Sequence, residues 1–178
     1  MMPKCVVGSS MQLQSKVYKM WKKFKSEMKK ISRLPHDKND FMTPAYPFDD
    51  YPIVRQELVH QLSELGFELL NDNNRRFHGP IVCANTFELQ THNRSVPEHT
   101  DDVGRGLYFA IFPVKHKNIV KCQEQTMTEF NFYLDSGKKC VGLKDVEVVV
   151  FNPRKPHSLI YYGDETTFML FTVKRIKK

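Results

Sequence analysis

The second half of the chain contains a succession of short segments with the pattern of β-strands, and no helical pattern interrupts them. The segments are rich in Val, Phe, Tyr and Thr, which favour extended backbone, and turns such as Asp135-Ser136-Gly137 separate them. Parallel strands need long crossover connections, so this spacing favours a mostly antiparallel sheet. Strands are predicted at residues 81–90, 106–114, 128–134, 147–151, 158–162 and 166–173.

Two stretches before the strands have helical spacing. In residues 13–31 apolar side chains recur every three or four positions, and Pro35 ends the pattern. Residues 51–70 repeat this spacing, and we expect Gly66-Phe67 to end that helix early. Helices followed by a run of strands predict a mainly β, α+β fold, with the helices packed outside a β-sandwich or barrel.

The length of 178 residues suits one domain with an appendage. We predict a basic amphipathic helical extension at residues 1–35, a Pro-rich linker at 36–50, and a β-rich domain with a packing helix at 51–178. The first ten residues have no periodicity and are expected to be disordered.

The net charge of +7 comes from one segment. Residues 16–33 contain eight Lys or Arg and one acid, Glu27, so the other 19 basic and 19 acidic residues cancel. This segment fits an anionic partner, which could be nucleic acid, a membrane surface or an acidic protein. We favour the alternative in which its apolar stripe packs on the domain and the lysines are solvated.

The remaining composition predicts a cytoplasmic protein. No run approaches the ~20 apolar residues of a transmembrane helix, and the N-terminus lacks the apolar core of a signal peptide. The four cysteines form no Cys-x-x-Cys pair, which argues against a structural zinc site.

His99 and Asp101, followed much later by His157, form the candidate metal site. Alternate side chains of an extended strand share a face, so His99 and Asp101 point the same way while Thr100 and Asp102 do not. Two imidazoles and one carboxylate make the facial triad of non-haem Fe(II) oxygenases, which leaves positions open for a co-substrate and oxygen. His-x-Asp also occurs by chance, so the surrounding sequence decides. We interpret His36, His60, His78, His92 and His116 as non-ligands.

This context resembles the double-stranded β-helix of the Fe(II)- and 2-oxoglutarate-dependent dioxygenases, a jelly-roll or cupin-like barrel. In that superfamily His-x-Asp lies near the start of the barrel, and the distal His follows a strand, as His157 follows residues 147–151 and an Asn-Pro turn. Pro97 and Arg105 complete a match to the PxHxDxxxR pattern of small phage and bacterial members, including relatives of aspartyl/asparaginyl and prolyl hydroxylases. The resemblance covers roughly residues 87–175, about half the chain.

The resemblance implies a hydroxylase that uses Fe(II), held by His99, Asp101 and His157, together with oxygen and 2-oxoglutarate. The substrate stays open among a peptide or protein side chain, a nucleobase and a small metabolite. Tyr108 and Phe112, which share a strand face, could line the barrel interior, as could Tyr161, although packing in the core is the default role for each.

The cation that should bind 2-oxoglutarate is not in its usual place. Most such enzymes carry Arg or Lys about ten residues after the distal His, because the far carboxylate must be neutralised inside a partly dry barrel. Here that region is Asp164-Glu165-Thr166-Thr167-Phe168. Some branches of the superfamily take the cation from the end of the last strand or from the strand after the proximal ligands. The candidates are Arg105, Lys115 with its neighbour Lys117, Lys174 and Arg175.

Two other classes of function fit the same residues. A cupin-like metalloprotein would use the barrel and ligands for a different reaction or for none. A non-catalytic binding or structural protein would act through its basic N-terminal helix.

Overall fold

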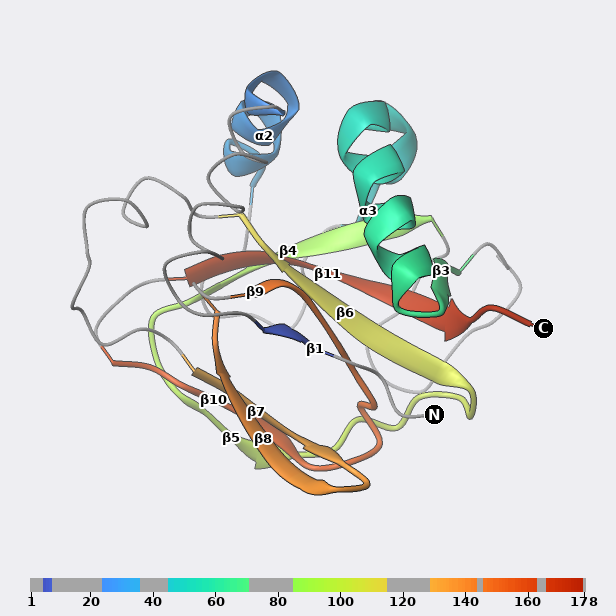
Figure 1. Cartoon of the computed structure of the whole chain (residues 1–178). Coiled ribbons are helices and arrows are strands. Elements are labelled where there is room, and N and C mark those ends of the chain that lie inside the picture. Colours follow the sequence, from blue (N-terminus) through green and yellow to red (C-terminus); the bar gives the residue numbers. More distant parts are fainter. Residues whose placement is uncertain are drawn as a thin grey trace.

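In the computed structural model, residues 5–7, 24–35, 45–70, 85–114, 129–143, 146–162 and 166–177 are described. They form two antiparallel β-sheets, two α-helices and a short 3-10 helix (Figure 1). The larger sheet contains β1 (Cys5–Val7), β2 (Ala45–Pro47), β3 (Phe67–Leu69), β4 (Thr86–His92), β6 (Leu107–Pro113), β9 (Val146–Phe151) and β11 (Thr166–Arg175). Its strand order is β1-β9-β6-β11-β4-β2, and β3 pairs with β11.

The smaller sheet carries the candidate site. It contains β5 (Val96–His99), β7 (Glu129–Leu134), β8 (Gly137–Gly142) and β10 (His157–Ile160), in the order β5-β10-β7-β8. In Figure 1 it lies on one side of the larger sheet, and the helices α2 (Lys25–Ser32) and α3 (Pro52–Glu64) lie on the other.

The central strands β6, β9 and β11 of the larger sheet are buried on both faces, and their side chains alternate between two hydrophobic clusters. On β9, Val149 and Phe151 point toward the smaller sheet, while Val148 and Val150 point toward the helices. We call these the inner and outer faces. The inner-face cluster consists of Val103, Phe109, Ile111, Phe130, Phe132, Val141, Leu143, Val149, Phe151, Leu159 and Phe168. Burial on both faces explains why β6, β9 and β11 have nearly continuous apolar sequences.

The acid in the basic segment joins the two helices. Pro52, the first residue of α3, has no N–H, and the next two N–H groups, of Ile53 and Val54, donate to the Glu27 carboxylate over 3.0 and 2.7 Å. Glu27 is buried, as are Met28 and the other apolar residues of α2. In the described part of the basic segment, the apolar stripe therefore packs on the core.

The predicted mainly β fold is confirmed. The strands predicted at 106–114, 128–134, 147–151, 158–162 and 166–173 are β6, β7, β9, β10 and β11, each within two residues at either end. The predicted strand 81–90 corresponds to β4, and residues 81–84 lie outside the described residues. The helix predicted from residue 51 ends early, as expected, and Gly66 follows it with a φ of 86°.

The structure also differs from the prediction. In the described ranges no strand pairing joins the two sheets, so they form two facing layers and a closed barrel is not confirmed. Tyr108 and Phe112 contact the outer-face residues and do not point between the sheets. The inner positions of β6 are Phe109 and Ile111, which alternate along the strand with Tyr108 and Phe112.

Two segments predicted to be irregular contain regular structure. Cys5–Val7 pairs with β9, so the expectation of disorder is wrong for these residues. Residues 45–50, in the predicted Pro-rich linker, form β2 and the 3-10 helix η1 (Phe48–Asp50). Pro47 is tolerated because β2 is an edge strand, and Phe48 is fully buried. The division of the chain into three parts stays a prediction. No helix among the described residues has the length and apolarity needed to cross a membrane.

We expect Glu27→Ala to lower the free energy of unfolding by about 1–3 kcal/mol, because two N–H groups at the start of α3 lose a charged acceptor. Glu27→Gln, which keeps the shape and one acceptor oxygen, should lose less. Urea denaturation measures both. The exposed Lys30→Ala on the same helix is the control and should change stability by no more than about 0.5 kcal/mol. Equal losses in Lys30→Ala and Glu27→Ala would contradict the capping role.

Candidate metal centre

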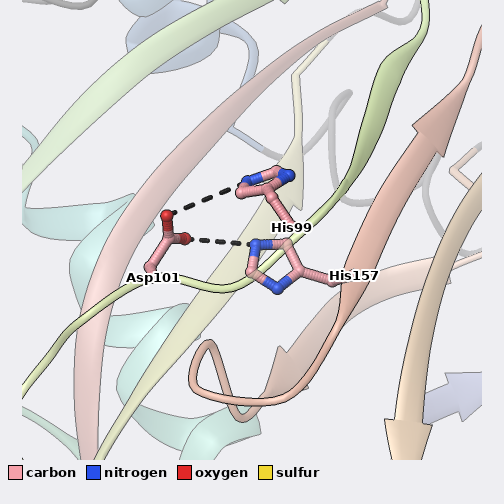
Figure 2. Close-up of side chains that lie close together, drawn as sticks. All are labelled: His99, Asp101 and His157. Atoms are coloured by element: carbon pink, nitrogen blue, oxygen red, sulfur yellow. Dashed lines mark hydrogen bonds and ion pairs between the residues drawn. The ribbon is translucent and has the colours of Figure 1, made fainter.

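The pairing of β5 with β10 brings the two predicted histidines together. His99, the last residue of β5, is the cross-strand partner of His157, the first residue of β10, and their ring centroids are 4.4 Å apart. The chain then turns so that the Asp101 carboxylate faces both rings (Figure 2). Its Oδ2 lies 3.1 Å from Nε2 of His157, and its Oδ1 lies 3.8 Å from Nε2 of His99. The structure therefore brings together all three predicted ligands.

Each imidazole is oriented by a backbone carbonyl two residues earlier. Nδ1 of His99 is 2.7 Å from the Pro97 oxygen, and Nδ1 of His157 is 3.0 Å from the Lys155 oxygen. A carbonyl can only accept, so these contacts place the proton of a neutral imidazole on Nδ1. The Nε2 atoms of both rings are directed toward Asp101, and Nε2 of His157 is within hydrogen-bond distance of Oδ2. A metal would bind on this side of the rings, as is common for histidines whose other ring nitrogen bonds a carbonyl.

The three donors fit a divalent metal. Their ligand atoms all lie within 4.8 Å of one another, and within the described ranges no other group of three or more His, Cys, Asp or Glu side chains is close enough. The 3.1 Å separation of His157 Nε2 and Asp101 Oδ2 matches two ligand atoms at right angles with bonds of about 2.1 Å. A mixed set of imidazole and carboxylate donors suits Fe(II).

Exposure rises steadily across the triad. The side chain of His157 is 6% exposed, that of Asp101 28% and that of His99 42%. The buried His157 ring lies 5.0 Å from the Phe151 ring and 6.2 Å from that of Phe130, both in the inner-face cluster. One side of the site is therefore apolar and fixed, and solvent or a reactant reaches it from the side of His99.

Sequence reasoning missed one residue beside the site, Arg154. Its Nη1 donates to the carbonyls of Gly104 and Leu107, at 2.7 and 2.9 Å, in the segment that follows Asp101. No sequence signal identifies this role, because an Arg in an Asn-Pro turn usually points into solvent. The segment that carries Arg154 and the segment that carries Asp101 also meet through the backbone. There the N–H of Asp101 donates to the Pro153 oxygen over 2.7 Å.

The candidate cations for 2-oxoglutarate do not gather at one place. Arg105 is exposed in the segment after Asp101. Lys174 forms an ion pair with Glu68, with 3.5 Å between Nζ and Oε1. Lys115 and Lys117 lie outside the described residues.

Arg175 faces away from the triad. It follows Val173 on the outer face of β11, and its guanidinium lies over the rings of Tyr108 and Phe67, 5.4 and 6.0 Å from their centroids. The adjacent Lys174 has the opposite parity and belongs to the inner face.

The other described histidines have different contacts. His92 stacks on Phe168 with centroids 5.3 Å apart, and burial, aided by the charge of Arg94, lowers the pKa of His92. His60 pairs with Glu64 on the surface of α3. Neither belongs to the group formed by His99, Asp101 and His157, and His36, His78 and His116 lie outside the described residues.

Comparisons with known proteins give a distant likeness. No protein-family model matches the chain, and no curated protein matches its sequence. Among solved structures, a prolyl-4-hydroxylase from Pseudomonas putida is similar with a TM-score of 0.47 and 13% sequence identity, covering 99% of this chain and 92% of that one. At this similarity the comparison assigns no family.

We expect the protein to bind one Fe(II) or Co(II) ion, and Asp101→Asn to weaken that binding by about 100-fold or more, because the substitution removes the only anionic ligand. Asp102→Asn is a matched control, since it makes the same chemical change at the exposed neighbouring position. Calorimetric titration with Co(II) measures both affinities. Equal affinities in the two variants would show that the triad does not hold the metal.

Proposed function

We propose that the protein is a non-haem Fe(II)- and 2-oxoglutarate-dependent oxygenase that hydroxylates a C–H bond. The observation that supports the proposal is the His99, Asp101 and His157 group, whose two Nε2 atoms face one carboxylate and lie within 4.8 Å of its ligand oxygen and of each other. A two-histidine, one-carboxylate set leaves the opposite side of the ion open, as an oxygenase requires. The two facing sheets support the related proposal that the fold is a double-stranded β-helix.

The protein's part in this reaction is to bind, orient and exclude water. Fe(II), when bound, would supply the activation of oxygen, with 2-oxoglutarate as the source of two electrons. His157 and its aromatic neighbours Phe151 and Phe130 supply the dry wall of the site. The more exposed His99 borders the side from which a substrate can approach.

For the far carboxylate of 2-oxoglutarate we propose Lys174. From Thr166 to Thr172 the inner-face side chains of β11 are all uncharged. Lys174 is therefore the first cationic side chain on this face of the strand. Lys174 pairs in register with Leu107, which begins the strand that follows the Asp101 segment. Its ion pair with Glu68 is partly exposed at both ends and is therefore weak enough to exchange for another carboxylate.

A buried hydroxyl next to Lys174 supports the same location. Thr172 is 4% exposed, and its Oγ1 has no hydrogen-bond partner in the described part of the chain. Thr172 pairs with Phe109, which pairs with Phe151, and the Phe151 ring contacts that of His157. This row connects Thr172 to the triad across the inner face, and a carboxylate there would give the hydroxyl a partner. Arg105 and Lys115 stay as alternatives, and Arg175 on the outer face is the least favoured.

We further propose that the basic segment contacts an anionic partner, to which its helix α2 contributes charge and no apolar contact. The apolar side chains of α2 are buried, whereas Lys25, Lys29, Lys30 and Arg33 are exposed and make no ion pair with a described residue. The substrate class stays open among protein side chains, nucleobases and small metabolites, and a cytoplasmic location is part of the same proposal.

The proposed activity predicts that the protein converts 2-oxoglutarate to succinate in the presence of Fe(II) and oxygen. His99→Ala should lower this rate to the background, because one of two imidazole ligands is lost, while Asp102→Asn should retain it. Succinate can be measured directly by mass spectrometry. Unchanged turnover in His99→Ala would contradict the proposal. Metal binding with no spectral change on adding 2-oxoglutarate would favour a cupin-like metalloprotein.

Lys174→Ala should raise the KM for 2-oxoglutarate by at least about tenfold and leave Co(II) affinity unchanged, because it removes a charged partner of the far carboxylate and no metal ligand. The exposed Lys177→Ala, three residues along the chain, makes the same change of charge and is the control. An unchanged KM in Lys174→Ala would transfer the role to Arg105 or Lys115.

A further inference from the structure

Two turns face each other beside the triad. The first, at residues 152–155, has Asn followed by Pro, a favourable order for a turn, and the N–H of Lys155 donates to the Asn152 carbonyl over 3.1 Å. The Asn152 Oδ1 also accepts the N–H of Arg154, at 3.0 Å. This pair of bonds fixes the backbone from which the Arg154 side chain projects.

The second turn, at residues 104–107, joins the Asp101 segment to β6. The N–H of Leu107 donates to the Gly104 carbonyl over 3.3 Å, and Gly106 has a φ of 81°, the positive value that the third residue of a type II turn adopts. The carbonyls of Gly104 and Leu107, the two ends of this turn, both accept hydrogen bonds from Nη1 of Arg154.

The first turn thus contacts two of the three metal-binding residues as well as the second turn. The Pro153 carbonyl accepts a hydrogen bond from the N–H of Asp101, and the Lys155 carbonyl accepts one from Nδ1 of His157. Asp101 itself lies beyond the end of β5, so no strand pairing holds it. Its position depends on the contact between the two turns.

We propose that Arg154 is a positioning residue for the metal centre. It clamps the turn at 104–107 against the turn at 152–155 and so presents the Asp101 carboxylate to the histidines. This inference rests on the metal site of the proposed function. A guanidinium is suited to the task because it stays charged, is planar and donates two hydrogen bonds from one nitrogen.

The arrangement separates this role from co-substrate binding. Two hydrogens of Arg154 are directed at backbone carbonyls, and its guanidinium lies 5.9 Å from the centroid of the Tyr108 ring. Loss of these bonds releases the segment that carries Asp101, and metal affinity should fall before any effect on 2-oxoglutarate. Loss of a residue that only binds the co-substrate would leave metal affinity intact.

The test is Co(II) affinity and the visible Co(II) spectrum of the full chain, with urea denaturation of the metal-free protein alongside. Arg154→Ala should weaken Co(II) binding by about 10- to 100-fold, the range found for residues that orient metal ligands. Arg154→Lys, which keeps the charge and lacks the planar fork, should lose less. Millimolar guanidinium should restore binding to Arg154→Ala, compared with NaCl at equal ionic strength.

Two controls isolate the positioning role. Arg33→Ala makes the same substitution at an exposed site on α2, and Ile31→Val destabilises the outer-face cluster away from the metal. Both should keep the Co(II) affinity of the wild type. If Ile31→Val loses Co(II) affinity in proportion to its loss in free energy of unfolding, then lower stability alone would explain the effect of Arg154→Ala. That result would overturn the inference.

The remaining outcomes separate this inference from the proposed function. If Asp101→Asn loses Co(II) and Arg154→Ala does not, the positioning role is wrong and the metal site stands. If in addition Arg154→Ala raises the KM for 2-oxoglutarate, Arg154 binds the co-substrate. If the wild type does not bind Co(II), or Asp101→Asn binds it equally well, the metal site and the positioning role are both wrong.

Discussion

The antiparallel pairing of β5 with β10 determines whether the candidate site exists, because it places His99 opposite His157 although the two are distant in sequence. A slip of this pairing by one residue would turn one imidazole to the other side of the sheet. The register is held on one side by β7, which pairs with β10, and by the burial of Leu159 in the inner-face cluster. The geometry of the candidate site therefore depends on ordinary packing between the two sheets.

The larger sheet gives the smaller one a rigid surface to pack on. Its strands β6, β9 and β11 are buried on both faces. The helices α2 and α3 cover the outer face, and the smaller sheet, with Leu159 of β10, packs on the inner face. Glu27 ties the two helices together through the N-terminus of α3. Through this chain of contacts the described part of the basic segment contributes to the core, although Lys25, Lys29 and Lys30 are exposed.

Local pattern was enough to predict most strands, the early end of α3, and the three residues that the structure brings together at the candidate site. Strand parity does not explain the direction of Asp101, because β5 ends at His99. It did not find β1, β2, β3 or β8, which are short or polar and rely on pairing with a stronger neighbour. It left open whether Tyr108 and Phe112 line the space between the sheets or pack elsewhere in the core, because one sequence does not show which layer each face of a strand meets. Both pack in the outer-face cluster, in agreement with the default role. The roles of Glu27 and Arg154 depend on contacts across 26 to 50 residues, for which one sequence carries no local signal.

The two kinds of ligand are held by different means, and this makes Asp101 the sensitive member of the triad. Each histidine is part of a paired strand and donates to a carbonyl two residues earlier, so its orientation is local and forms with the strand. Asp101 lies past the strand and is placed by the backbone of Pro153. A proton or a metal ion between the carboxylate and the imidazoles makes their closeness favourable. This closeness lasts only while the turns at residues 104–107 and 152–155 stay in contact. A substitution that separates the turns would leave both histidines in place and remove the carboxylate, which would change the site from three ligands to two.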